Sequence, residues 1–199
     1  MFPERIETDR LTLERISHDL IDVFDLYELY SVGDETEEMF EYWDTPPHET
    51  VKDTYDYIDE AERLWDEGAG AKYVIRPKDG EDGSGVIAGT TRLYPDWQKR
   101  STNLGILLEK RFWGRGYSGE RADALISVAF DRLDLDLVVA VHVDGNEKSR
   151  RAITKYIDRH GGRYEGRLRN WLSVSDSVVD VHRYSISIEE YRAVSGTPR

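Results

Sequence analysis

The feature that most constrains this chain is a succession of strand, glycine turn, helix and strand across residues 101–143. Residues 101–110 predict a strand, and the stretch "GRGYSG" at residues 114–119 follows shortly after it. Beyond the glycines, apolar residues spaced three and four apart predict a helix that buries one stripe. They are Ala122, Leu125, Ile126, Ala129, Phe130 and Leu133. Residues 135–143 are almost continuously apolar and β-branched, as expected of a central strand covered on both faces.

The segments before this unit predict strands and two helices. Residues 10–16 alternate as a half-buried strand does, and Ser17 is a predicted N-cap. The helix after Ser17 is expected to have one apolar face, made of Leu20, Val23, Phe24 and Tyr27. Residues 51–65 predict a second amphipathic helix, and residues 71–77 and 85–95 predict two strands joined by a polar hairpin loop.

The segments after the unit complete one domain. Residues 146–160 predict a helix that stops at Gly161 and Gly162, and the chain is then expected to close with two antiparallel strands. The predicted fold is therefore a single α+β domain over residues 1–199, with a mixed, mostly antiparallel sheet flanked by helices. The strand–turn–helix–strand core occupies about residues 101–160 of it.

The composition excludes several functions. Forty Asp and Glu residues against 27 Lys and Arg give a net charge of −13, so we expect no nucleic-acid partner, because binding phosphates needs excess positive charge. The acids are spread along the chain, which suggests a surface adapted to a high-salt cytoplasm. The absence of cysteine excludes disulfides, thiolate nucleophiles and Cys-ligated zinc. No secretion signal or apolar run of about 18 residues occurs, so we expect a cytoplasmic protein without membrane or metal.

The glycine turn is suited to an anion. Glycines lack Cβ atoms, so successive N–H groups can point at one ligand, and the following helix adds its partial positive charge. Positive residues gather here despite the negative net charge, with net +2 over residues 109–121 and net +3 over residues 147–155. These observations favour a polyphosphate ligand over a turn that only connects two elements.

Three classes of site could use such a turn. A dinucleotide-binding domain needs glycines directly at the strand end and further strand–helix units, and too little chain follows Asp144 for these. A hydrolase nucleophile elbow needs G-x-S-x-G, but Glu120 stands where the last glycine belongs after Ser118. The third class is an acyl-CoA site, in which the turn holds a pyrophosphate and the preceding strand pairs with the pantetheine arm.

The third interpretation is supported by a family resemblance. "ILLEKRFWGRGYSGERADALISVAF" followed by "VDGNEKSRRAITKY" resembles the acetyl-CoA core of the GNAT N-acetyltransferase superfamily. "FWGRGY" and the opening "ETDRLTLERI" resemble its RimJ/RimL-type branch in particular. The likeness extends from about Ile6 to Ile188, although the wider superfamily has Gln or Arg at Trp113 and Gly or Ala at Ser118.

The resemblance implies acetyl-CoA as co-substrate and a set of residues that bind it. These are Leu107, Leu108, Arg111, Trp113, Gly114, Arg115, Gly116, Tyr117, Ser118, Gly119, Asn146 and Ser149. Among the glycines, Gly114 and Gly116 are expected to be essential to the turn, and Gly119 to begin the helix.

The resemblance also implies direct attack of an amine on the thioester, with no covalent enzyme intermediate. The oxyanion is expected to bind a backbone N–H of Leu107 or Leu108. Glu109 is the first candidate for the base that deprotonates the amine, followed by Asp96 and Tyr94. Ser149 is the candidate that protonates the thiolate, with Tyr156 as its rival.

Trp43 and Tyr94 are expected to contact the amine acceptor, because an aromatic ring suits a cationic amine. The acceptor could be a protein N-terminus, a ribosomal protein or a small amine, and the chain a monomer or homodimer. A GNAT-like domain that binds acetyl-CoA as a sensor, without catalysis, is the alternative.

Overall fold

The structure is a computed structural model that describes residues 1–31, 36–43, 45–174 and 177–196. Its centre is one sheet whose eight described strands lie in the order β1-β2-β3-β4-β5-β6-β8-β7. The strands are β1 (Arg5–Glu7), β2 (Leu11–Arg15), β3 (Ala71–Pro77), β4 (Gly89–Asp96), β5 (Ser101–Leu108), β6 (Leu137–Val143), β7 (Arg163–Val174) and β8 (Ser177–Ser187). Neighbouring strands are antiparallel, except that β5 and β6 are parallel.

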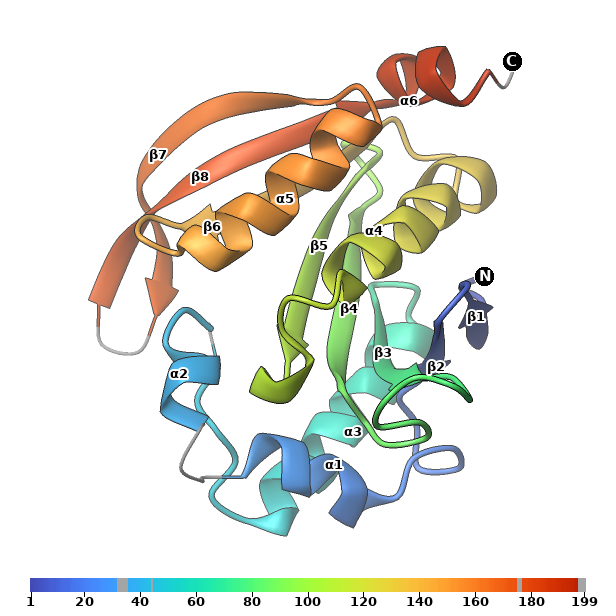
Figure 1. Cartoon of the computed structure of the whole chain (residues 1–199), viewed down its shortest axis with the longest axis vertical. Helices are drawn as coiled ribbons and strands as arrows, with labels where there is room; N and C mark the ends of the chain where they lie inside the picture. Colours follow the sequence, from blue (N-terminus) through green and yellow to red (C-terminus); the bar gives the residue numbers. More distant parts are fainter. Residues whose placement is uncertain (32–35, 44, 175–176, 197–199) are drawn as a thin grey trace.

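Helices cover both faces of this sheet (Figure 1). The helical segments are α1 (Val23–Tyr30), α2 (Thr36–Phe40), α3 (Val51–Asp66), η1 (Lys110–Phe112), α4 (Tyr117–Ser127), η2 (Val128–Arg132), α5 (Glu147–Arg159) and α6 (Ile188–Ser195). The larger core joins α4, α5 and α6 to one face, through residues such as Leu125, Tyr156 and Tyr191. The second core joins α1, α2 and α3 to the other face, through residues such as Leu29, Phe40 and Ile58. None of the described helices combines the length and apolar character needed to cross a membrane.

The predicted α+β domain and its central unit are confirmed. All six apolar residues predicted to form the stripe of the helix after the glycines are buried. The predicted strand at residues 71–77 coincides with β3, and the predicted hairpin joins β3 to β4, although β4 begins only at Gly89. Thr50 and Asp53 form a capping box that starts α3 at Val51, as the amphipathic pattern predicted.

The prediction for the first helix was wrong in its start and in its face. Ser17 is not the N-cap of α1, because the helix begins only at Val23, and Ser17 instead opens a separate turn in which its carbonyl accepts from the N–H groups of Leu20 and Ile21. Asp22 caps α1 instead, its side chain accepting from Phe24 N at 2.7 Å. Starting the helix at Val23 turns Leu26, Leu29 and Tyr30 inward, while Leu20 and Phe24 remain exposed.

Two more differences concern the ends of the chain and β6. The short strand β1 and the helix α6 were not predicted, although Ser187 and Glu190 form a capping box that starts α6. The prediction that β6 is covered on both faces was wrong. Its residues alternate between buried, as Val138 and Ala140 are, and half-buried, as Val139 and Val141 are, because α5 packs over only one side of the strand.

Candidate active site

The strands β5 and β6 are paired only where they begin. Their register joins residues 101–103 of β5 to residues 137–139 of β6. Beyond Asn103, β5 remains paired with β4, and β6 with β8, but the described residues give no further pairing between β5 and β6. We call this unpaired side of residues 104–108 the β5–β6 gap. It lies at the ends of the two strands that lead into α4 and α5 (Figure 1).

Two hydrogen bonds establish which backbone groups of β5 face this gap. Glu109 N donates to Ala88 O at 2.9 Å, on the β4 side of the strand. Arg100 O accepts from Leu137 N at 3.2 Å, on the β6 side. Successive residues of a strand direct their backbone groups to opposite sides. Even-numbered residues of β5 therefore face β6, and odd-numbered residues face β4.

This alternation distinguishes the two leucines of the sequence prediction. The N–H and C=O of Leu108 face the gap, and its carbonyl accepts from Trp113 Nε1 at 2.8 Å. Leu107 instead faces Thr90 on β4, and its side chain is buried in the core beneath α1. The sequence reasoning missed Ile106 and Leu104, whose backbone groups also face the gap.

The glycine turn holds a series of unused donors. Gly114 (φ 77°) and Gly116 (φ 84°) adopt the left-handed backbone that glycine allows, whereas Gly119 lies inside α4. Within the described residues, no acceptor takes a hydrogen bond from any backbone N–H of residues 114–118. Gly119 N and Glu120 N, by contrast, donate to Gly116 O. Five successive free N–H groups at a helix start fit a phosphate or pyrophosphate.

A partly buried ion pair, between Glu120 and Arg10 just before β2, braces this turn. Arg10 donates from Nε to Glu120 Oε2 at 2.8 Å and from Nη1 to Arg115 O at 3.0 Å. Thr8 Oγ1 donates to Glu120 Oε1 at 2.6 Å. Burial alone would raise the pKa of Glu120, but the hydrogen bonds from Thr8 and Arg10 bring that pKa below its usual value. The sequence reasoning missed Arg10 and Glu120 as positioning residues, since they are 110 residues apart.

The cations predicted around the turn are mostly paired with acids. Arg115 Nη2 lies 2.8 Å from Asp82 Oδ2, and Arg111 Nε lies 2.8 Å from Glu109 Oε1. Asp82 raises the pKa of Arg115 above its ordinary value. The positive islands of the sequence are thus partly neutralised, and an anion arriving at the turn would compete with these carboxylates.

Asn146, Ser149 and Tyr156 all belong to α5 or its cap, but they occupy different surroundings. Asn146 Oδ1 caps the helix by accepting from Ser149 N at 2.9 Å, which leaves its amide nitrogen outside that bond. Ser149 is half-buried in the first turn, beside the end of β6. Tyr156 lies about two turns beyond Ser149, buried within the core, and burial raises its pKa to about 12. The structure therefore brings Asn146 and Ser149 together and leaves Tyr156 apart from them.

Trp43 and Tyr94 meet around a cation of the chain itself. The guanidinium carbon of Arg92 lies 4.4 Å from the Trp43 ring centroid and 5.5 Å from that of Tyr94. Arg92 also covers Gly105, its partner on β5, so closely that a Cβ there would lie 2.6 Å from its Nε. No spacing in the sequence indicates this contact.

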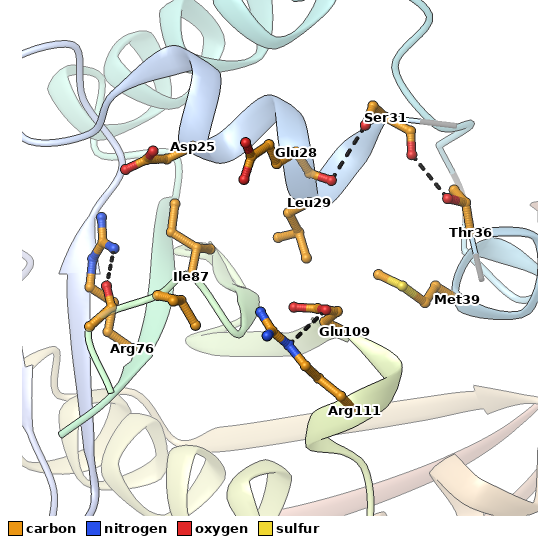
Figure 2. A pocket seen from close by; sticks show the side chains of 12 residues that line it. Asp25, Glu28, Leu29, Ser31, Thr36, Met39, Arg76, Ile87, Glu109 and Arg111 are labelled. Carbon is orange, nitrogen blue, oxygen red and sulfur yellow. Dashed lines mark hydrogen bonds and ion pairs between the residues drawn. The ribbon is translucent and has the colours of Figure 1, made fainter. Parts of the chain in front are cut away.

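Glu109 lines a cavity of about 480 Å³ on the α1 side of the sheet. The wall opposite Glu109 comes from α1 and α2, where Glu28, Leu29 and Met39 line it (Figure 2). Asp96, the second candidate base, lies elsewhere. It pairs with Ser101 at the β4–β5 turn, at the opposite end of β5, and binds Lys99 at 2.6 Å.

Comparison with known proteins identifies the class of protein that this fold and site define. The acetyltransferase (GNAT) domain family matches residues 10–156, so the chain belongs to the GNAT acetyltransferase family. It is an acetyl-CoA-dependent N-acetyltransferase, with acetyl-CoA as its co-substrate.

Individual relatives agree with that assignment. The uncharacterised N-acetyltransferase YoaA of Bacillus subtilis is 27% identical over 187 residues, which cover 94% of this chain and 97% of YoaA. YdaF of Bacillus subtilis, provisionally named a ribosomal N-acetyltransferase, is 32% identical over 108 residues, or 54% of this chain and 57% of YdaF. The crystal structure of the microcin C7 self-immunity acetyltransferase MccE, in complex with acetyl-CoA and AMP, has the same fold. Its TM-score is 0.80 at 19% identity, covering 94% of this chain and 98% of that one.

Proposed function

We propose that this enzyme acetylates the α-amine of a protein or peptide, as a member of the RimJ/RimL-type branch, by direct attack on acetyl-CoA. The observation that carries the proposal is the β5–β6 gap ending beside the five free N–H groups of residues 114–118. The "FWGRGY" motif and the similarity to YdaF support the branch.

In this proposal the turn binds the pyrophosphate of acetyl-CoA. The N–H groups of residues 114–118 face the phosphates, with Arg111 and Arg115 beside them and Gly119 inside the following helix. Trp113 holds the turn against the end of β5 through Leu108. Ile106 and Leu108 offer the backbone groups to which the pantetheine arm pairs, and the Asn146 amide faces it from α5.

The reaction needs a base, an oxyanion donor and an acid. When bound, acetyl-CoA supplies the thioester carbonyl that the amine attacks. Glu109, at the edge of the cavity, accepts the proton of the incoming amine, directly or through water. A backbone N–H facing the gap, at Leu108 or Ile106, stabilises the oxyanion. Ser149 protonates the departing thiolate, and we favour it over its rival Tyr156 because Tyr156 is buried in the core.

The acceptor preference follows from Arg92. Trp43 and Tyr94 are proposed to line the acceptor site, and the cation already between them is Arg92. A second cation in that position would be repelled, so the site favours an amine whose neighbouring groups are neutral or acidic over a polyamine. A peptide N-terminus meets this requirement and spermidine does not.

The test is thiol release from acetyl-CoA with a panel of acceptors. We expect turnover with peptide N-termini, more with an acidic second residue than with a basic one, and little with spermidine. Glu109→Gln should lower kcat at least tenfold while acetyl-CoA still binds, because the amide keeps the shape of the side chain and leaves Arg111 free for the phosphates but cannot accept the proton. Turnover of spermidine above that of every peptide would contradict the acceptor class. An unchanged kcat would remove Glu109 from its role.

A further inference from the structure

Glu38 on α2 bridges two lysines that belong to separate parts of the candidate active site. Its Oε2 lies 2.9 Å from Lys110 Nζ, in η1 just beyond β5. Its Oε1 makes a short ion pair with Lys148 Nζ, in the first turn of α5. Hydrogen bonds from Lys148 and then Lys110 lower the pKa of Glu38, so the carboxylate is ionised at neutral pH. One carboxylate therefore joins the two sides of the β5–β6 gap.

The position of these lysines relates Glu38 to the glycine turn. Lys148 Nζ lies 4.1 Å from the ring centroid of Trp113, directly before Gly114. Lys110 lies between Leu108, whose backbone faces the gap, and the turn itself. Lys148 thus contacts the residue before the glycine turn, and Lys110 lies in the segment that leads into the turn of residues 114–118. An anion bound there would be attracted by the same two charges that Glu38 now neutralises.

We propose that Glu38 is a built-in competitor of acetyl-CoA: its carboxylate holds Lys110 and Lys148 until the pyrophosphate replaces it. This inference rests on the proposed binding of the pyrophosphate at residues 114–118. Carboxylate and phosphate oxygens accept the same charge-assisted hydrogen bonds, and a pyrophosphate brings more negative charge than one carboxylate. The exchange breaks two ion pairs of Glu38 and makes new ones between the lysines and the phosphates.

The exchange has a structural consequence, because α2 also forms part of the Glu109 cavity. Thr36 and Met39, on either side of Glu38 in α2, line that cavity, and Phe40 is buried in the core with Leu107. Release of Glu38 frees this wall from η1 and α5. Coenzyme binding at the turn thereby affects the wall of the cavity that Glu109, the proposed base, also lines.

The size of the effect follows from exposure. The side chains of Glu38, Lys110 and Lys148 are 39, 40 and 57% exposed. Ion pairs at such positions are weak and are screened by salt, so removing the competitor should tighten acetyl-CoA binding only about two- to fivefold.

The experiment is calorimetric titration of acetyl-CoA into the full chain at low and at high KCl. Glu38→Gln keeps the shape of the side chain and removes its charge. Glu37→Gln is the matched control, since Glu37 is an exposed acid on the same helix and makes no ion pair within the described residues. We expect Glu38→Gln to bind acetyl-CoA two- to fivefold more tightly than Glu37→Gln at low KCl, with the difference vanishing at high KCl.

A double-mutant cycle tests whether the tighter binding caused by Glu38→Gln depends on Lys148. In a Lys148→Gln background, Glu38→Gln should give less tightening than in the wild type. Equal or weaker binding by Glu38→Gln than by Glu37→Gln would overturn the competition, as would tightening unaffected by Lys148→Gln. Gly116→Trp separates this result from a failure of the proposed coenzyme site. If Gly116→Trp and Lys148→Gln both leave affinity unchanged, the site is misplaced. If Gly116→Trp weakens binding while Glu38→Gln changes nothing, only the competition is wrong.

Discussion

At the scale of single residues, the glycines of the turn differ in what they contribute. Gly114 needs a positive φ, and a Cβ added there meets nothing within 4 Å, so strain is the only cost of a side chain. A non-glycine residue in that conformation costs about 1–2 kcal/mol. Gly119 has an ordinary helical backbone, and its added Cβ would meet only the end of the flexible Arg159 side chain.

The first prediction compares alanine at these two positions. Gly114→Ala should lower the free energy of unfolding by about 1–2 kcal/mol and weaken acetyl-CoA binding, because the strain alters the path of the N–H groups. Gly119→Ala should be neutral or stabilising by up to about 1 kcal/mol, since alanine favours a helix. Urea unfolding and calorimetry measure both. Equal losses in the two variants would mean that backbone conformation is not what the turn requires.

Arg121 is a charged residue that the core holds without full compensation. It is 1% exposed on α4, and its Nε and Nη1 have no hydrogen-bond partner among the residues that the structure describes. Burial lowers the pKa of its guanidinium to about 10. A charge buried in this way costs folding free energy that an apolar side chain of similar length does not.

The second prediction is that Arg121→Met stabilises the protein by about 1–4 kcal/mol, as replacements of buried charges by packed apolar groups do. Thermal and urea unfolding at neutral pH measure the change. Arg132→Met is a control, because Arg132 is exposed and donates to Met1 O at the surface. A destabilised Arg121→Met would show that Arg121 has partners, such as buried water, that the protein needs.

At the scale of elements, the sequence predicts those whose signal is local. The apolar stripe of α4 and the amphipathic pattern of α3 each repeat over consecutive turns, so the sequence predicts both helices. The start of α1 was misplaced because Ser17 and Asp22 are both acceptable caps, and tertiary packing of Leu26 and Leu29 decides between them. The capping box of α6 was present and overlooked.

The residues of the candidate site likewise divide into those that the local sequence predicts and those that it does not. The glycine turn and Asn146 follow from residues near one another in the chain, and the structure places both beside the β5–β6 gap. The contacts of Arg92 with Trp43, of Arg10 with Glu120 and of Glu38 with Lys148 join distant segments. No local periodicity carries information about such pairs. The backbone phase of β5, which separates Leu108 from Leu107, likewise depends on pairing with β4 and β6.

The third prediction concerns His48, which lies between α1 and α3 beside the second core. His48 is buried there, stacked on Tyr30 with ring centroids 4.5 Å apart, and its Nδ1 lies 2.7 Å from Thr54 Oγ1. Burial lowers the pKa of His48. As the pH falls below about 6.5, His48 therefore binds a proton in the unfolded chain before it does so in the folded chain. Stability should decline by up to about 1.4 kcal/mol per pH unit through this one group.

Unfolding free energies between pH 7 and 5 test this contribution. His48→Gln should reduce the pH dependence in that range, even if it lowers stability at pH 7. His18→Gln is the control, since His18 lies at the surface of the same helix pair and binds Asp59 at 2.8 Å. The same pH slope in wild type and His48→Gln would contradict the prediction.

At the scale of the whole molecule, a net charge of −13 opposes folding through mutual repulsion. Surface ion pairs act in the other direction, but those with exposed partners, such as Lys52–Asp56 and Arg63–Glu67, each contribute little. Salt screens both effects. If salt weakens the repulsion more than the ion pairs, the protein is more stable at high salt, as an adapted acidic surface requires.

The fourth prediction is that the free energy of unfolding rises between 0.1 and about 2 M KCl, because screened repulsion outweighs the weakened ion pairs. Urea unfolding at several KCl concentrations measures it. A variant with Asp9, Asp19 and Glu37 all changed to the corresponding amides should gain less from salt. These three acids are exposed and form no ion pair within the described residues, so the variant removes repulsion without removing attraction. A stability that is flat or falls with KCl would mean that ion pairing dominates, and the acidic surface would then need another explanation.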